Sequence, residues 1–182
     1  MTESIQQFLP GAIVTGSSRG IGAAIATQLA ADGYGVCVNY VHNEEKARDV
    51  VSRIEAAGGR AIAVQGDVGR FDDVATLVER TSSAFGGIRV IVNNAGLSEH
   101  RKLSELSVED WNRSIAVNLS SAMFTVKSAL DWLHEEPWAR VVNICSLRAM
   151  TGSDHGAQYA AAKSGLIGLT KSLARKLAPD IT

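Results

Sequence analysis

The chain has 182 residues, of which 46% are hydrophobic and 20% are charged, an ordinary composition for a folded domain with a substantial core. Its formal net charge of −1 excludes a strongly basic molecule, so we expect no nucleic acid partner. The opening segment MTESIQQFLPGAIVTG has neither a basic start nor a long apolar run; it therefore predicts no signal peptide and no membrane span, and we expect a cytoplasmic protein.

Short apolar runs alternate with longer segments of helical periodicity along the chain. In chain order, strands are expected at 11–16, 34–40, 60–68, 88–96 and 139–146. Helices are expected at 20–33, 43–59, 70–87, about 107–134 and about 156–178. Because the strands carry continuous apolar runs rather than strict alternation, they should be buried on both faces of a parallel sheet. The sequence thus predicts an α/β fold, a doubly wound Rossmann-type parallel sheet with helices on both faces, in a single domain over residues 1–182.

The segment TGSSRGIG, residues 15–22 and here called the glycine turn, joins the first strand to the first helix. Gly16 permits a tight turn, and Gly20 and Gly22 let the backbone approach a ligand. The helix N-terminus then offers free N–H groups to a pyrophosphate. Such a turn alone is weak evidence, since many strand-to-helix turns need glycine, but within this alternation it predicts a nucleotide site.

The glycine spacing resembles the cofactor turn of the short-chain dehydrogenase/reductase family. The match continues with NNAG at 93–96, Asn118 in the segment WNRSIAVNL, Ser146, and YAAAK at 159–163, and it covers the chain from about residue 9 to 182. The resemblance implies an oxidoreductase that moves hydride between a nicotinamide and a carbonyl or secondary alcohol. The chain is similar to family members that act on 3-oxoacyl carrier proteins or on glucose.

The resemblance also implies which residues contact the cofactor. They are Gly16, Ser18, Arg19, Gly20, Ile21, Gly22, Tyr40, Asp67, Val68, Asn94, Ala95, Gly96, Tyr159 and Lys163. An NAD enzyme needs an acid at the end of the second strand for the ribose 2′-hydroxyl, whereas this strand ends in Asn39 and Tyr40. Arg19 can pair with a 2′-phosphate, although it could instead be a solvated turn residue. NADP(H) is therefore predicted over NAD(H).

Two of the neighbouring polar positions have alternative interpretations. By resemblance, the Asp67 side chain and the Val68 backbone would hold the adenine, but Asp67 could instead cap the next helix. Asn93 could touch the ligand or stabilise the sheet. Glu44 and Glu45 are expected to face solvent at the start of the second helix.

Tyr159 and Lys163 are four residues apart on a predicted helix and therefore share a face. A free tyrosine has a pKa of about 10, and a nearby ammonium favours its ionised form. Tyr159 is thus the predicted general acid and base, with Lys163 assisting it and holding the nicotinamide ribose. Ser146 follows the fifth strand and could stabilise charge on the substrate oxygen. Asn118 resembles a residue that holds a water in a proton relay to the lysine.

Three further expectations concern cysteines, metals and partners. Cys37 and Cys145 lie in apolar runs and are predicted to be buried, reduced thiols. The four histidines, His155 among them, show no metal-ligand spacing, so no metal site is predicted. The family resemblance implies a homodimer or homotetramer formed through helices 107–134 and 156–178.

The segment APDIT, residues 178–182, stops where family members normally begin a sixth strand, followed by a nicotinamide-contacting turn and a seventh strand. We expect one sheet edge to be uncovered and most of the substrate pocket to be absent. The substrate is left open among a 3-oxoacyl thioester, a ketone and a sugar or polyol. The acidic segment LHEEPW disfavours an acidic carrier. A truncated, non-catalytic dimerising or nucleotide-binding protein is the alternative.

Overall fold

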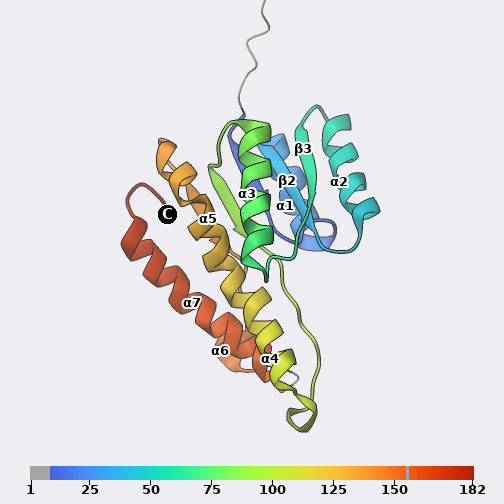
Figure 1. Ribbon diagram of the computed structural model, residues 1–182, viewed down its shortest axis with the longest axis vertical. Helices are drawn as coiled ribbons and strands as arrows, with labels where there is room; N and C mark the ends of the chain where they lie inside the picture. The colour runs from blue at the N-terminus through green and yellow to red at the C-terminus, as the bar shows by residue number, and fades with distance from the viewer. Residues whose placement is uncertain (1–8, 155) are drawn as a thin grey trace, which may run out of the picture.

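A computed structural model describes residues 9–154 and 156–182, so the predictions for the first eight residues and for His155 lie outside the described residues. The strands are β1 (Gly11–Val14), β2 (Gly35–Tyr40), β3 (Arg60–Gln65), β4 (Val90–Asn93) and β5 (Arg140–Asn143). They form one sheet in the order β3-β2-β1-β4-β5, and every neighbouring pair is parallel (Figure 1). The chain therefore starts at the centre and winds outward in both directions, which confirms the predicted doubly wound fold.

Helices follow each strand and cover both faces of the sheet. The major helices are α1 (Gly20–Ala31), α2 (Glu44–Ala56), α3 (Phe71–Phe85), α4 (Val108–Ile115), α5 (Ser121–Glu135) and α7 (Ala157–Leu177). Three short segments complete them, η1 (Leu103–Glu105), the π-helical η2 (Ala116–Ser120) and α6 (Arg148–Thr151). Glu44 and Glu45 are exposed in the first turn of α2, as predicted. None of the described helices is long and apolar enough to cross a membrane.

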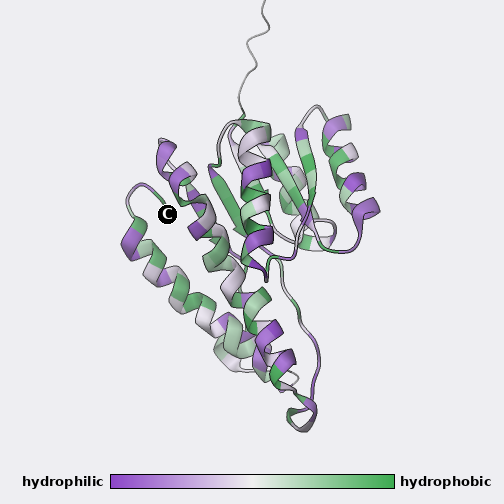
Figure 2. Cartoon of the chain, in the orientation of Figure 1, coloured by the Kyte–Doolittle hydropathy of each residue, from purple (hydrophilic) through white to green (hydrophobic). Residues whose placement is uncertain are grey.

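The core has two layers because successive strand residues point to opposite faces. Ala12 and Val14 pack with residues of α1 and α2, whereas Ile13 packs with residues of α3 and α5. All four residues of β1 are buried, as expected for a strand covered on both sides. Figure 2 shows the same division, with hydrophobic strands inside and hydrophilic residues on the outer faces of α2 and α3.

The structure differs from the predicted helices in two respects: one long helix is interrupted, and the short helices η1 and α6 were not predicted. The single helix expected at 107–134 is three consecutive segments, because η2 interrupts the α-helical pattern between α4 and α5. Asn118 lies within that π segment, and π-helical insertions are frequent at functional sites. Helix α6, at Arg148–Thr151, was not predicted, because four residues are too few for a periodic signal.

The β5 edge of the sheet explains the one wrong prediction about the cysteines. Cys37 is buried in β2, but Cys145 is exposed, because it lies just beyond β5, the outermost strand on that side of the described sheet. Ile181 forms a parallel bridge to Ala139, and the Val141 N–H donates to the Thr182 carbonyl at 2.9 Å. The last residues therefore pair with this edge near the start of β5.

Candidate active site

The glycine turn has a shape that requires glycine at specific positions. Gly16 has a positive φ of 61°, and a Cβ there would lie 2.9 Å from the Ala95 Cα. A Cβ on Gly22 would lie 2.5 Å from the Asn94 Nδ2. Gly20 also has a positive φ, of 58°, but faces open space. The turn therefore packs tightly on its inner side and leaves its outer side open to a ligand.

Helix α1 begins in this turn without a side-chain cap. Its N-cap residue is Arg19, whose side chain makes no capping hydrogen bond, so the first N–H groups of α1 keep their donor capacity. Ile21 is a large apolar residue that is 66% exposed at the same point. Ser18 and Arg19 line an open groove between α1 and α2, where Lys46 and Arg53 lie farther along. This end of α1 is therefore an electropositive site suited to an anion.

Three buried polar side chains, which were not among the residues predicted for the site, hold the glycine turn. Asn39 accepts a hydrogen bond from the Gly16 N–H at 3.0 Å and donates to the Gly66 carbonyl at 3.0 Å. The Ser17 hydroxyl accepts from the Asn39 N–H at 3.0 Å. The Thr15 hydroxyl accepts from the N–H groups of both Asn94 and Ala95 at 3.0 Å. These bonds join residues far apart in the chain, so no local pattern could have indicated them.

The end of β2 carries no acid, but Tyr40 itself is buried. Its side chain is only 7% exposed and packs in the core beside Ala47 and Val50. The buried Tyr40 side chain therefore supports the predicted preference for NADP(H) only because it carries no negative charge.

Asp67 lies directly after β3 and does not cap the next helix. Its carboxylate accepts from the Gly69 N–H at 2.9 Å and pairs with Arg113 at 2.7 Å, rather than binding an N–H group within α3. The helix-cap alternative is therefore wrong. Val68 is buried next to it.

Asn93, the last residue of β4, has a structural role, and the residues after it are less buried. Asn93 donates to the Asn143 side chain at 2.8 Å and accepts from the Thr125 hydroxyl at 2.8 Å. Asn93 thus connects β4 to β5 and α5. Of the two predicted alternatives, its role in the structure is therefore to stabilise the sheet. Asn94 donates to the carbonyls of Thr15 and Gly16, and Gly96 is exposed.

Tyr159 and Lys163 share one face of α7, as the spacing predicted. The Lys163 Nζ lies 6.0 Å from the centroid of the Tyr159 ring and donates to the Ile144 carbonyl at 2.8 Å. Lys163 is only 4% exposed. Burial lowers the pKa of its ammonium, an effect that the nearby Cys145 thiol partly offsets. A buried lysine with one carbonyl partner is well placed to exchange a proton.

Ser146 follows β5 at the point where that strand meets α7. Its hydroxyl accepts from the Arg148 N–H at 3.2 Å, and the preceding Cys145 Sγ contacts the Lys163 carbonyl at 3.4 Å. Tyr159 and Arg148 line a common cavity with Ser98, Glu99, His100, Ser153 and Gly156. The loop after β4 and the start of α7 therefore border this cavity, whereas Ser146 and Lys163 are not among its lining residues.

Asn118 lies in η2 and is 2% exposed, and its side chain makes several hydrogen bonds. It accepts from the Leu97 N–H at 3.0 Å and donates to the Leu97 carbonyl at 2.9 Å and to Ser114. A Cβ on Gly96 would lie 3.1 Å from the Asn118 Oδ1 and 4.0 Å from the Lys163 Nζ. Asn118 and Lys163 thus border the same space beside Gly96.

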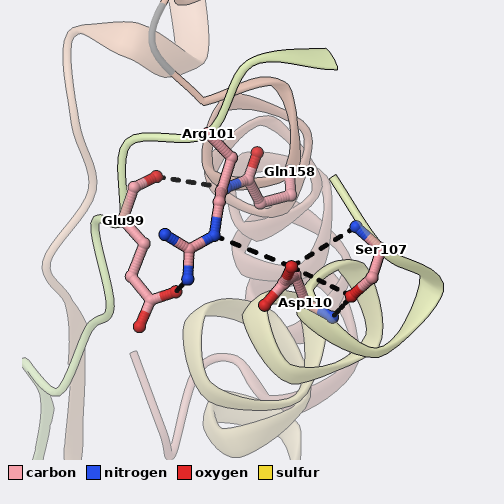
Figure 3. Close-up of polar contacts among 5 residues, drawn as sticks. All are labelled: Glu99, Arg101, Ser107, Asp110 and Gln158. Atoms are coloured by element: carbon pink, nitrogen blue, oxygen red, sulfur yellow. Dashed lines mark hydrogen bonds and ion pairs between the residues drawn. The ribbon is translucent and has the colours of Figure 1, made fainter. Parts of the chain in front are cut away.

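A polar network fixes the loop between β4 and α4 next to Tyr159 (Figure 3). Gln158, 3% exposed, donates from its Nε2 to the Glu99 carbonyl at 3.1 Å. Arg101 lies between the Glu99 carboxylate, at 3.3 Å, and the Asp110 carboxylate, at 3.7 Å. Asp110 forms a capping box with Ser107 at the start of α4. This network was not predicted. The Ser107 and Asp110 spacing carries a local signal, and Glu99 and Arg101 are two residues apart, whereas the bonds of Gln158 to Glu99 and of Arg101 to Asp110 connect separate segments.

The histidine, cysteine, aspartate and glutamate side chains within 9–154 and 156–182 include no cluster of three that could hold a metal ion.

The sequence and the fold of the chain match those of known proteins. Residues 11–182 match the family model described as short chain dehydrogenase. The chain is 42% identical over 167 residues to a 3-oxoacyl-[acyl-carrier-protein] reductase of Synechocystis sp., covering 92% of this chain and 68% of the relative. It is 40% identical over 167 residues to 3beta-hydroxysteroid dehydrogenase 1 of Eggerthella lenta, covering 91% and 64%. A short chain dehydrogenase of Burkholderia cenocepacia in complex with NADP superimposes with a TM-score of 0.90 at 42% identity, covering 95% of this chain and 71% of that one.

Proposed function

The chain belongs to the short chain dehydrogenase family, a family of oxidoreductases, and we propose on that premise that it interconverts a carbonyl compound and the corresponding secondary alcohol with NADP(H). The observation that carries the proposal is the position of Tyr159 and the buried Lys163 on one face of α7, where Tyr159 lines a cavity and Lys163 donates to the Ile144 carbonyl just beyond β5. In a doubly wound sheet, ligands bind at the carboxyl ends of the strands.

The residues of the glycine turn fit a dinucleotide. Gly16 and Gly22 have no room for a side chain, Gly20 faces open space, and the uncapped start of α1 offers N–H donors to a pyrophosphate. Arg19 would hold the 2′-phosphate, supported by the missing acid at the end of β2 and by the NADP bound to the Burkholderia relative. The other contacts are proposed for Ser18, Ile21, Asp67, Val68, Asn94, Ala95 and Gly96. When bound, the nicotinamide supplies or accepts the hydride.

Proton transfer is the proposed task of the protein itself. Tyr159 would donate its hydroxyl proton to the carbonyl oxygen during reduction and remove it from the alcohol during oxidation. The Ser146 hydroxyl would donate a hydrogen bond to the same oxygen. Lys163, whose pKa burial lowers, would replace the proton of Tyr159. The shared space beside Gly96 would hold the water that connects Lys163 with Asn118.

The decisive experiment compares the wild-type chain with Tyr159→Phe for NADPH oxidation on a panel of carbonyl compounds. We expect the variant to lose roughly 10²- to 10⁴-fold in kcat while it binds NADPH as the wild type does. Tyr34→Phe, a partly buried tyrosine outside the cavity, is the matched control and should keep full activity. Undiminished turnover by Tyr159→Phe would contradict the proposed acid and base.

A 3-oxoacyl thioester is the carbonyl substrate that we propose to test first. The support is the Synechocystis relative, which is named for that activity, whereas the Eggerthella relative is named for a steroid. The cavity beside Tyr159 is lined with polar side chains, including Ser98, Arg148 and Ser153, which suits a polar acyl group better than a steroid skeleton. Faster reduction of a steroid ketone than of acetoacetyl-coenzyme A would contradict the proposal that the substrate is a 3-oxoacyl thioester.

We also propose that two copies associate through the α4–α5 region and α7. Trp111 and Met123 are apolar side chains that are 39% and 38% exposed on these helices, and Leu173 is half-buried on α7. Light scattering on the purified chain is expected to give a mass of twice or four times 19.3 kDa. A monomer at micromolar concentration would contradict this assembly.

A further inference from the structure

A partly buried ion pair connects the loop after β3 with helix α4. The Arg113 Nη1 lies 2.7 Å from the Asp67 Oδ2, and the two side chains are 43% and 20% exposed. The other carboxylate oxygen of Asp67 accepts from the Gly69 N–H at 2.9 Å. Each oxygen of this carboxylate therefore has one fixed partner, so the orientation of the group is set from two sides.

The same loop is docked on α4 and η2 by packing. Val68 is buried in a small cluster with Val74 and with Val117 of η2. A Cβ on Gly69 would lie 2.9 Å from the Arg113 Nη1 and 3.2 Å from a Val117 methyl group, so Arg113 is close against the backbone of the loop. Arg113 thus pairs with the Asp67 carboxylate and leaves no room for a side chain at position 69 of the loop.

Asp67 keeps capacity for a further donor. An ionised carboxylate offers about four lone-pair sites, and Gly69 and Arg113 use two of them. Asp67 also lines a hollow at the carboxyl ends of β2 and β3, together with Val41, Gln65 and Gly66. A carboxylate can only accept hydrogen bonds, so any group that it recognises in this hollow must donate one.

We propose that Arg113 is a positioning residue that holds the Asp67 carboxylate for the exocyclic amino group of a purine, and so selects a 6-amino over a 6-oxo dinucleotide. This inference rests on the proposed function, in which Asp67 lies at the adenine. Without Arg113, the carboxylate could rotate about its side-chain bonds and bind water instead. A 6-oxo purine presents an acceptor in place of the amino donor, so the correctly held carboxylate disfavours it.

The test measures the dissociation constants of NADPH and of its hypoxanthine analogue by quenching of tryptophan fluorescence. A hydrogen bond to a charged group corresponds to roughly a 10- to 100-fold preference of the wild type for NADPH. Arg113→Ala should weaken NADPH binding and reduce the preference to within about threefold, and Asp67→Asn should do the same. Arg113→Lys, which keeps the charge, should retain part of the preference for NADPH. Arg70→Ala is the matched control, because Arg70 lies in the same loop but pairs with Asp73 of α3 at 3.6 Å rather than with Asp67, and it should leave the preference unchanged.

The outcomes separate this inference from the proposed function. If Arg113→Ala is folded, as judged by its thermal unfolding, and keeps the full preference, Arg113 does not position Asp67. Should that variant not fold, Arg113→Lys and Arg113→Gln decide the matter, because the glutamine variant must lose the preference and the lysine variant must keep part of it. If the wild type binds both dinucleotides equally, the inference fails while the cofactor proposal stands. If the wild type binds neither, both fail.

Discussion

Replacing Asn39 with alanine is expected to destabilise the glycine turn and weaken dinucleotide binding together. Asn39 is 1% exposed at the end of β2, where it connects three segments of the chain. Its Oδ1 accepts from the Gly16 N–H, and its Nδ2 donates to the Gly66 carbonyl, both at 3.0 Å. An alanine removes both bonds and leaves the buried Gly66 carbonyl without this donor.

The expected size of the effect follows from those two bonds. Each backbone group that loses its partner costs about 1 to 2 kcal/mol, so Asn39→Ala should lower the free energy of unfolding by about 3 kcal/mol. Asn39→Asp should cost more. One carboxylate oxygen can still accept from Gly16, but the other would face the carbonyls of Val64 and Gly66, which both now accept from Nδ2. Urea unfolding with linear extrapolation measures both values.

Asn43→Ala is the matched control for this prediction. Asn43 is an exposed asparagine that caps α2 by accepting from the Lys46 N–H at 3.0 Å, and its loss should cost about 1 kcal/mol. It should leave the dissociation constant of NADPH unchanged, whereas Asn39→Ala should raise that constant severalfold. Equal destabilisation by the two alanine variants, or unchanged NADPH binding by a folded Asn39→Ala protein, would refute the reasoning.

Four further predictions test the two halves of the site and the two thiols of the chain. Arg19→Ala should weaken NADPH binding by roughly 10- to 100-fold and NADH binding little, whereas Arg53→Ala, on the same groove, should change neither dissociation constant severalfold. Arg101→Ala should raise the KM for the carbonyl substrate severalfold through the loosened loop, with NADPH affinity unchanged and Lys102→Ala as the inert control. At pH 8, iodoacetamide should alkylate Cys145 but not Cys37, as peptide mass spectrometry will show. Burial raises the pKa of the Cys37 thiol to about 12, whereas the unfolded thiol has a pKa of about 8.5. The stability that this difference contributes is therefore complete below a pH of about 8.5 and is lost as the pH rises toward 12, because only the unfolded chain ionises in that range. Cys37→Ala should remove this part of the alkaline fall in unfolding free energy.

The fold was predictable because its signals are local. Each strand is a short apolar run, and each major helix has either a regular apolar spacing or acids in its first turn. The glycine turn was equally readable, because positive φ at Gly16 and close packing at Gly22 restrict those positions to glycine. The break at η2 was not readable, since residues 107–134 keep helical composition throughout.

Most contacts of the site that the sequence did not reveal are long-range. Thr15, Asn39 and Gln158 bind partners that are distant in the chain. Their importance comes from burial, which makes an unpaired polar group costly, and burial is known only when the elements have been assembled. Cys145 was mispredicted for the related reason that an apolar run does not show whether its strand lies at the centre or the edge of a sheet.

These hidden contacts determine how the two halves of the site are placed relative to one another. The Thr15 hydroxyl binds the N–H groups of Asn94 and Ala95, and the Asn118 carboxamide binds the N–H of Leu97, so the segment 94–97 is held from β1 on one side and from η2 on the other. A parallel sheet alone aligns strand ends but leaves the loops beyond them free to move. Because this short segment spans the distance between the glycine turn and the space beside Lys163, its two anchors fix the proposed nicotinamide end against the proposed proton donor. The proposed catalytic geometry therefore depends on the Thr15 and Asn118 side chains, so substitutions there should impair turnover as well as lower stability.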